Sequence, residues 1–350
     1  MKIFHALVSF TAALVLSLGQ SVSAFADTLS EKQPEIRLTS VMATAPYRPI
    51  SFALDYMADF VSKRTGGKFT IQRRMSYGDV SSSDCLVKVI INTDDITVVP
   101  FEVISNFIPW LEIMDVPYLF SLRNYEELTV GGQANAEICK EISDGETRII
   151  ALDTWYTDFV QLVMRSRPVY TPGDLKGQRI WIPYDGPVAS YLSVLGATPV
   201  VMPFNLAYEN IRYADDVDGM AIPLNTLITR KQIFEKMRFV SLPSLLRGGY
   251  VVIVSQQRYD SLPPAYQSVL RQAAEEASAF LNDYNMECLR VVMGRLIRDP
   301  DIFINNPDLT RFVSQSEQLK RFFFKRYPKA VEKMRDTLNW QSNSGLIKDN

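Results

Sequence analysis

Short β-rich segments alternate with amphipathic helical segments along most of the chain. In the first half, the expected elements are strands at 36–41, 69–72 and 95–99, a helix carrying Ile50, Leu54, Met57 and Val61, a helix at 84–91 and a polar helix around 125–128. In the second half, they are strands at 179–182, 199–202 and 250–254, a helix at 187–195 and a helix that Asn205 caps. This alternation is typical of an α/β fold in which helices cover a sheet.

One predicted helix is much longer than the others. Residues 263–298 are rich in Ala and Glu, with no proline beyond the first two positions. At about 1.5 Å per residue, this helix would be about 50 Å long, which is more than one lobe needs. A chain of 350 residues also exceeds one ordinary compact domain. We therefore expect two lobes with one helix bracing both.

The first 26 residues predict a cleavable secretory signal peptide. Lys2 precedes an uncharged apolar run at 6–18, and small residues follow as far as Ala26. The apolar run is shorter than the roughly 20 residues that cross a membrane. The first cysteine is Cys85, so a lipid anchor is not expected either. The mature protein should therefore be exported to the periplasm and should not itself span a membrane.

Composition narrows the classes of function. The chain has 37 basic and 39 acidic side chains, so it lacks the basic field that holds nucleic acid. Its single histidine, His5, lies in the segment expected to be removed, which excludes histidine-based nucleophile systems and His-ligated metals from the mature chain. Cys85, Cys139 and Cys288 have no CxxC spacing and are expected to be small buried side chains. We predict neither an enzyme nor a cofactor or metal protein.

A series of short motifs resembles the extracytoplasmic solute receptors of tripartite ATP-independent periplasmic (TRAP) transporters, the DctP-type family, in the same order along the chain. The motifs are Arg64-Thr65-Gly66-Gly67-Lys68, Val116-Pro117-Tyr118-Leu119-Phe120, Asp174-Leu175-Lys176-Gly177-Gln178-Arg179-Ile180, Leu195-Gly196-Ala197-Thr198-Pro199, Met202-Pro203-Phe204 and Val217-Asp218-Gly219. The resemblance covers nearly the whole mature chain. It implies a two-lobed periplasmic-binding-protein clamshell that closes on a ligand by hinge bending.

The same resemblance implies a division of the chain and a set of partners. Lobe I would comprise 34–157 with 253–288, and lobe II would comprise 158–252 with 289–350. The expected partners are a small organic solute and the membrane permease subunits of a TRAP transporter, and the receptor is expected to be a monomer.

The sequence departs from the family pattern where the family binds a carboxylate. The family motif Gly-Leu-Lys-Ile-Arg ends in an arginine that forms a two-pronged salt bridge with the ligand, and Trp181 occupies that position here. A second family arginine falls on Gln161, and a Glu-Asn pair is replaced by Ala221 and Ile222. A charge-assisted hydrogen bond contributes roughly 1.5–3 kcal/mol, so losing both arginines should weaken an organic acid about a hundredfold or more.

We therefore expect an apolar, aromatic cleft that suits a neutral or aromatic solute. Its expected lining is Trp181, Phe204, Ile222, Trp155 and Tyr47, with Gln161 and Asn225 as polar groups. Arg179, two residues before Trp181 on the same strand face, is a candidate replacement cation, as are Arg165 and Arg167. The alternative for each aromatic residue is an ordinary core position, and for each arginine an exposed surface position.

Two other functions stay open at this point. A diverged receptor could serve ligand sensing or partner binding rather than transport, and the missing arginines favour that alternative. A carboxylate-based lyase or hydrolase would need two facing acids, such as those at 94–95 or 215–218, but acids in such turns commonly serve local capping.

Overall fold

The computed structural model describes residues 34–43, 48–75, 80–120, 125, 128–129, 132–228 and 230–337. The expected signal peptide, Tyr47 and Trp340 lie outside the described residues.

The first lobe is a mixed sheet in which the expected strands are confirmed. Three strands are parallel, β1 (Ile36–Met42), β2 (Phe69–Met75) and β3 (Ile96–Pro100), and β9 (Arg247–Ser255) runs antiparallel to β3. Apolar positions of α3 (Pro49–Arg64) and α11 (Pro264–Arg298) form its core together with side chains of the strands. The helix α4 (Ser82–Ile90) packs on β3 and begins with a Ser81–Asp84 capping box.

The second lobe continues the same sheet. Its strands are β5 (Arg179–Ile182), β6 (Thr198–Val201), β7 (Gly219–Pro223), β8 (Phe239–Ser241) and β10 (Phe303–Asn305). The helices α8 (Pro187–Val194) and α9 (Phe204–Tyr213) follow β5 and β6 as expected. However, α9 begins at Phe204 after Pro203, so Asn205 lies inside its first turn and the capping prediction is wrong.

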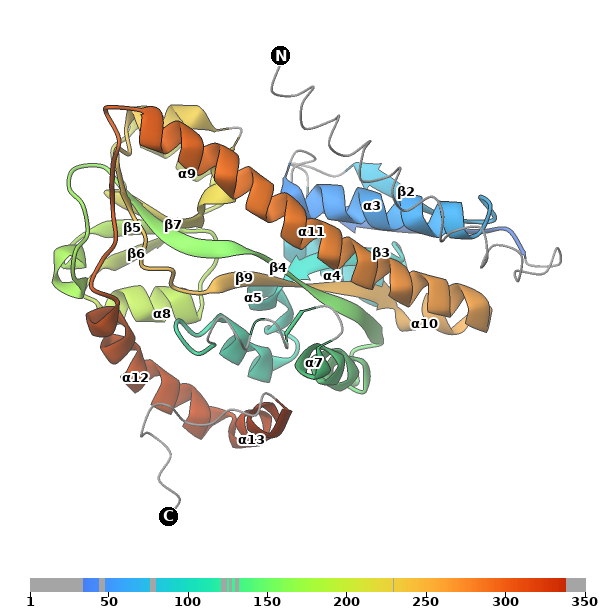
Figure 1. The fold of residues 1–350 in the computed structure, drawn as a ribbon. Helices are drawn as coiled ribbons and strands as arrows, with labels where there is room; N and C mark the ends of the chain where they lie inside the picture. Colours follow the sequence, from blue (N-terminus) through green and yellow to red (C-terminus); the bar gives the residue numbers. More distant parts are fainter. Residues whose placement is uncertain are drawn as a thin grey trace.

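One strand and one helix belong to both lobes. The strand β4 (Ile149–Met164) pairs with β9 as far as Phe159 and then with β7 and β8 from Val160 onward. A register shift between Tyr156 and Phe159 marks the change of partners. The 35-residue α11 crosses diagonally over both halves of the sheet (Figure 1). The predicted two-lobed α/β fold with a long shared helix is confirmed.

Two further features differ from the sequence prediction. The helix expected around 125–128 is described only at Tyr125 and Leu128, whereas the helix that packs on β4 is α7 (Gln133–Ser143). The glycine pair Gly248-Gly249, which the sequence alone would place in a loop, lies within β9. A Cβ at Gly249 would lie 2.3 Å from Cε2 of Phe101, so this strand position must be a glycine.

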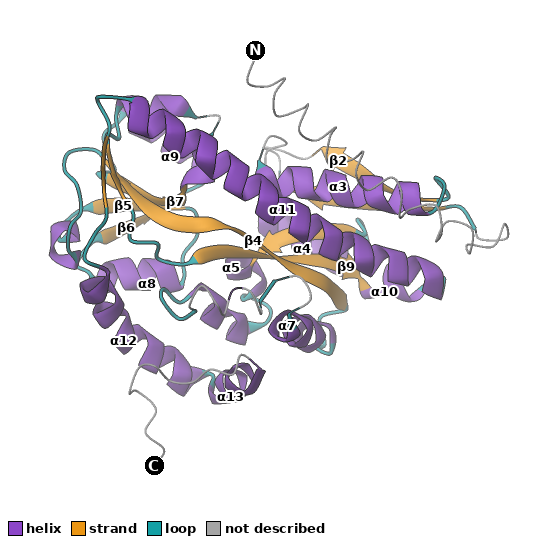
Figure 2. Cartoon of the chain, viewed as in Figure 1, coloured by secondary structure: helices purple, strands orange, loops and turns teal. Residues whose placement is uncertain are grey.

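The C-terminal helix pair, α12 (Leu309–Arg326) and α13 (Pro328–Thr337), connects the lobes on the side away from α11 (Figure 2). The helix α12 packs on α8 of the second lobe, and α13 packs on α7 of the first. Arg326 and Tyr327 both contact the Glu112 carboxylate, at 3.3 and 3.2 Å, and Lys333 pairs with Glu141. The C-terminal helices therefore dock on both lobes.

The three cysteines are free and buried, as predicted. Burial raises the thiol pKa of Cys85 to about 11 and that of Cys288 to about 12, and it raises the pKa of Cys139 as well. Within the described ranges, no helix is both long enough and apolar enough to cross a membrane.

Candidate functional site

The lobes meet through a small set of half-buried side chains, which we call the lobe junction. Arg48, just before α3, donates to the Thr226 carbonyl at 3.3 Å, and its guanidinium lies 4.4 Å from the centre of the Phe204 ring. The Ser82 and Tyr184 hydroxyls lie 3.4 Å apart. Glu102 of α5 (Phe101–Ile104) faces Gly186 in the second lobe, with its Cγ 3.9 Å from a Cβ built there.

Trp181 reaches the junction through another aromatic ring. It lies in β5, is 1% exposed, and its indole N–H donates to the Met202 carbonyl at 2.9 Å. The Phe204 ring meets it edge-on with the centroids 5.5 Å apart. Phe204 also contacts Arg48. Trp181, Phe204 and Arg48 therefore form a continuous series of contacts from the second-lobe core to the first lobe.

Both ends of the Gln161 amide form hydrogen bonds with one turn, at Ser244. Its Nε2 donates to the Ser244 hydroxyl at 3.1 Å, and its Oε1 accepts from the Ser244 backbone N–H at 2.9 Å. Ser244 has a φ of 49°, a left-handed conformation that is rare for a residue with a side chain. Gln161 therefore stabilises this turn.

Three of the other expected site residues lie deep in the protein. Trp155 is in the first-lobe core and donates its indole N–H to the Ala274 carbonyl at 3.0 Å. Ile222 packs in the second-lobe core with Trp181. Asn225 is buried and donates to Oδ1 of Asn285 at 2.6 Å, while its own Oδ1 has no hydrogen-bond partner in the described structure.

Arg179 forms a two-pronged ion pair with Asp218, with Nε–Oδ2 and Nη2–Oδ1 distances of 3.1 and 3.0 Å. Hydrogen bonds from Arg179 lower the pKa of the Asp218 carboxyl. The Arg179 side chain is 43% exposed. Arg165 pairs with Asp215 at 2.6 Å and also donates to backbone carbonyls. Arg179 and Arg165 therefore make these contacts within the second lobe.

A group of acids and tyrosines at the junction escaped the sequence prediction. The group consists of Glu102, Asp115, Tyr125, Tyr156, Tyr184 and Tyr250. Burial raises the pKa of Glu102 to about 7, and burial together with the Glu102 charge raises the pKa of Asp115 well above its ordinary value. Two signals were available: Glu102 is the second residue after the parallel strand β3, and Asp115 lies within an otherwise apolar run at 113–120.

Arg247 connects β9 with β4 and α11. From the start of β9, its Nε donates to the Thr157 carbonyl of β4 and its Nη2 donates to Oδ1 of Asn282 on α11, each at 3.0 Å. Its guanidinium lies 5.6 and 5.9 Å from the ring centres of Tyr125 and Tyr156. These contacts lie beside the register shift in β4.

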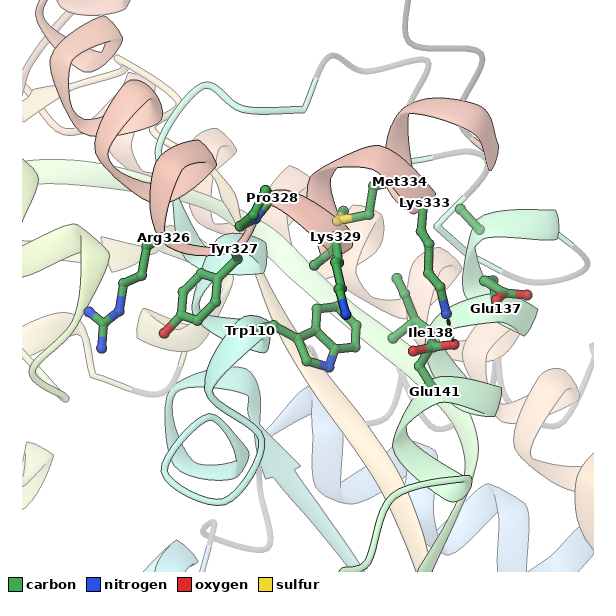
Figure 3. Close-up of a pocket in the computed structure, with 12 residues that line it drawn as sticks. Trp110, Glu137, Ile138, Glu141, Arg326, Tyr327, Pro328, Lys329, Lys333 and Met334 are labelled. Atoms are coloured by element: carbon green, nitrogen blue, oxygen red, sulfur yellow. Dashed lines mark hydrogen bonds and ion pairs between the residues drawn. The ribbon is translucent and has the colours of Figure 1, made fainter.

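Two cavities lie outside the acid–tyrosine group. One, of about 340 Å³, adjoins Phe204 and is also lined by Leu206, Tyr208, Glu209 and Arg230. The other, of about 480 Å³, lies between α7 and the C-terminal helix pair, where Trp110, Tyr327 and Met334 give it an apolar lining (Figure 3). Lys329, Lys333 and Glu141 lie around this second cavity, which is made by helices rather than by the junction side chains.

Comparisons with known proteins agree with this architecture. The model for bacterial extracellular solute-binding proteins of family 7 (DctP) matches residues 41–326. The 2,3-diketo-L-gulonate-binding periplasmic protein of Escherichia coli K12 is 26% identical over 172 residues, 49% of this chain and about half (51%) of that relative. A solute-binding protein of Verminephrobacter eiseniae is 25% identical over 90% of this chain and 92% of its own length.

Solved structures show the same fold. The TRAP periplasmic solute-binding protein of Chromohalobacter salexigens DSM 3043, with bound D-glucuronate, superimposes with a TM-score of 0.78 at 16% identity, over 87% of this chain and 100% of that one. The family match covers both lobes and the long shared helix. The chain belongs to family 7 of the bacterial extracellular solute-binding proteins, the DctP-type receptors of TRAP transporters.

Proposed function

We propose that this receptor captures a small organic solute at the lobe junction and delivers it to the membrane permease of a TRAP transporter. We further propose that the solute is neutral or aromatic rather than a simple carboxylate. Relatives include proteins named for 2,3-diketo-L-gulonate and C4-dicarboxylates, both of which are acids. The proposal thus separates this chain from those relatives by ligand chemistry.

The proposal rests on the residues that stand at the two positions where the family has an arginine. Trp181 and Gln161 are uncharged, and their N–H groups already donate to Met202 and Ser244. Neither side chain can therefore hold a ligand carboxylate as an arginine would. Phe204, which covers Trp181 and contacts Arg48, supplies an aromatic surface at the same place.

The division into lobes is part of the same proposal. Lobe I would comprise 34–157 with 253–288, and lobe II 158–252 with 289–350. The register shift between Tyr156 and Phe159 supports the boundary in β4. We also propose export to the periplasm through a signal peptide at 1–26 and a monomeric receptor.

The test compares neutral aromatic metabolites with their carboxylate counterparts by thermal unfolding, because a ligand that binds only the folded state raises the unfolding midpoint. The wild-type receptor should respond to neutral members of the panel. Trp181→Arg and Gln161→Arg, combined, should improve binding of the carboxylates at least tenfold. The control Arg179→Ala should leave binding unchanged, because Arg179 is paired with Asp218. A wild-type response confined to carboxylates would contradict the proposal.

Partner binding or sensing without transport is the second candidate, favoured by the same loss of both arginines. It predicts no midpoint shift with any compound of the panel at millimolar concentration. It also predicts that uptake by cells carrying the permease does not depend on this receptor.

A further inference from the structure

Two acidic side chains, Glu102 and Asp115, lie at the junction. Asp115, at the end of the 3₁₀ helix η2 (Pro109–Asp115), is 0% exposed, and both of its carboxylate oxygens are without a hydrogen-bond partner in the described structure. Glu102 is half-buried and faces Gly186 of the other lobe. Within the described ranges, neither carboxyl forms an ion pair.

The two carboxyls also act on each other. The elements that carry them, α5 and η2, pack on each other, and burial together with the Glu102 charge raises the pKa of Asp115. Like charges withdrawn from water destabilise a folded protein unless a counterion joins them. A positive group placed between the lobes would relieve this repulsion, whereas a ligand carboxylate would increase it.

Aromatic rings complete the surroundings. The charges of Glu102 and Asp115 both act on Tyr250, and Tyr184 and Tyr125 each lie near one of the two acids. Tyr156 is 1% exposed, and its hydroxyl has no hydrogen-bond partner in the part of the chain that is described. Aromatic faces together with carboxylates are the surroundings in which proteins bind organic ammonium groups.

The basic groups nearby are directed elsewhere. Arg48 contacts the Phe204 ring and the Thr226 carbonyl, and Arg247 contacts Thr157 and Asn282. Their charges act on the tyrosine hydroxyls of the group, Arg48 on Tyr184 and Tyr250 and Arg247 on Tyr125 and Tyr156. Among the residues that the structure describes, neither arginine is paired with Glu102 or Asp115.

We propose that the solute carries an ammonium group that Glu102 binds directly, with Asp115 as a positioning residue behind it. This inference rests on the proposed function, because it places the solute at the lobe junction. It keeps the junction as the site and replaces the neutral solute of that proposal by a small organic cation, preferably with an aromatic or apolar part to lie against Phe204.

The experiment uses sets of three compounds that differ only in one group: a primary amine, the matching alcohol and the matching acid. Tyramine, 4-hydroxyphenylethanol and 4-hydroxyphenylacetate form one set, and smaller sets extend down to methylamine, methanol and formate. Binding is measured by thermal unfolding and calorimetry on the mature receptor. At least one amine should bind tenfold or more tightly than its alcohol and its acid.

Two variants and a control locate the effect. Glu102→Gln should weaken the amine at least tenfold and leave the alcohol unchanged, and Asp115→Asn should have a smaller effect of the same sign. Glu287→Gln, which removes a carboxyl paired with Arg290 on α11, should change neither. Amine binding should strengthen from pH 6 to pH 8 as Glu102 ionises, while alcohol binding stays constant.

The possible failures are distinguishable. Alcohols that bind as well as amines would overturn the ammonium inference and leave the proposed function standing. Acids that bind best would overturn both. The absence of a response to any amine at millimolar concentration would also overturn the inference. A second readout needs no ligand: Glu102→Gln should raise the unfolding midpoint at pH 8, because it removes the repulsion, whereas a purely structural carboxylate would lower it when removed.

Discussion

Asn285 of α11 donates from Nδ2 to the backbone carbonyl of Tyr156 at 3.0 Å, which ties the middle of the long helix to β4 at its register shift. The Asn285 Oδ1 accepts from Asn225 of the second lobe. One buried side chain thus links an element of that lobe to the strand and the helix that both lobes share.

Replacing Asn285 should therefore destabilise the folded protein. Asn285→Ala removes two buried hydrogen bonds and leaves the Asn225 amide without its acceptor, which should lower the free energy of unfolding by about 2–4 kcal/mol. Urea denaturation measures this change. Asp283→Ala, at an exposed position of the same helix, is the control and should change stability by less than about 0.5 kcal/mol. Equal effects of the two variants would contradict the stabilising role of these two hydrogen bonds.

Gly249→Ala should disturb the packing of β9 against α5. The new methyl group would lie 2.3 Å from Cε2 of Phe101 and 3.0 Å from Cε1 of Tyr156, so these rings must move, at a cost of about 1–3 kcal/mol in the free energy of unfolding. Gly173→Ala is the matched control, because its nearest new neighbour would be 3.7 Å away. Chemical denaturation of both variants in parallel would show the difference, and a Gly249→Ala protein as stable as the control would disprove the close approach.

Stability should fall as the pH rises from about 4 to about 7. Burial raises the pKa of Asp153 to about 7, although Asn135 and Thr154 donate hydrogen bonds to its carboxyl. The folded state therefore binds a proton that the unfolded state has already released, so the free energy of unfolding declines by up to about 1.4 kcal/mol per pH unit for this group. Glu102 contributes in the same direction.

Asp153→Asn should flatten that decline, as denaturation curves at pH 5, 6 and 7 would show. The control is Asp84→Asn: hydrogen bonds from Ser81 lower the pKa of Asp84, so its pH dependence lies at lower pH. An unchanged slope in the Asp153 variant would refute the assignment.

Removing Glu112 should loosen the C-terminal helix pair without unfolding the body. Glu112→Ala takes away the partner of Arg326 and Tyr327, a loss of about 1 kcal/mol or less for each largely exposed contact. Amide hydrogen exchange in α13 should accelerate, while exchange in β4 and β9 stays slow. Glu317→Ala, which breaks a pair with Lys320 inside α12, should leave α13 unaffected.

The local elements could be predicted because their patterns are local. The spacing of Ile50, Leu54, Met57 and Val61 predicts α3, and the uninterrupted run from Pro263 to Arg298 predicts α11. The helix α7 was missed although Ala134, Ile138 and Ile142 recur at helical spacing and are buried.

The junction could not be predicted in the same way. The Gln161 amide donates a hydrogen bond to Ser244, 83 residues away, and the Trp181 indole donates one to Met202. The surroundings of both side chains therefore depend on how the strands pack. Asp115 and Glu102 come together only when η2 and α5 fold beside β9. The resemblance to a family pointed to Gln161 and Trp181, whereas the acids at the junction become visible only in the packed structure.

Because the three native cysteines are buried, the motion of the lobes can be measured with probes attached to newly introduced cysteines. Because the thiolate is the reactive form of cysteine, three buried thiols with raised pKa values react slowly with labelling reagents. One new cysteine on the exposed surface of each lobe would therefore be labelled first, in an otherwise native receptor. A pair of spectroscopic probes attached there would report the distance between the lobes as the solute is added.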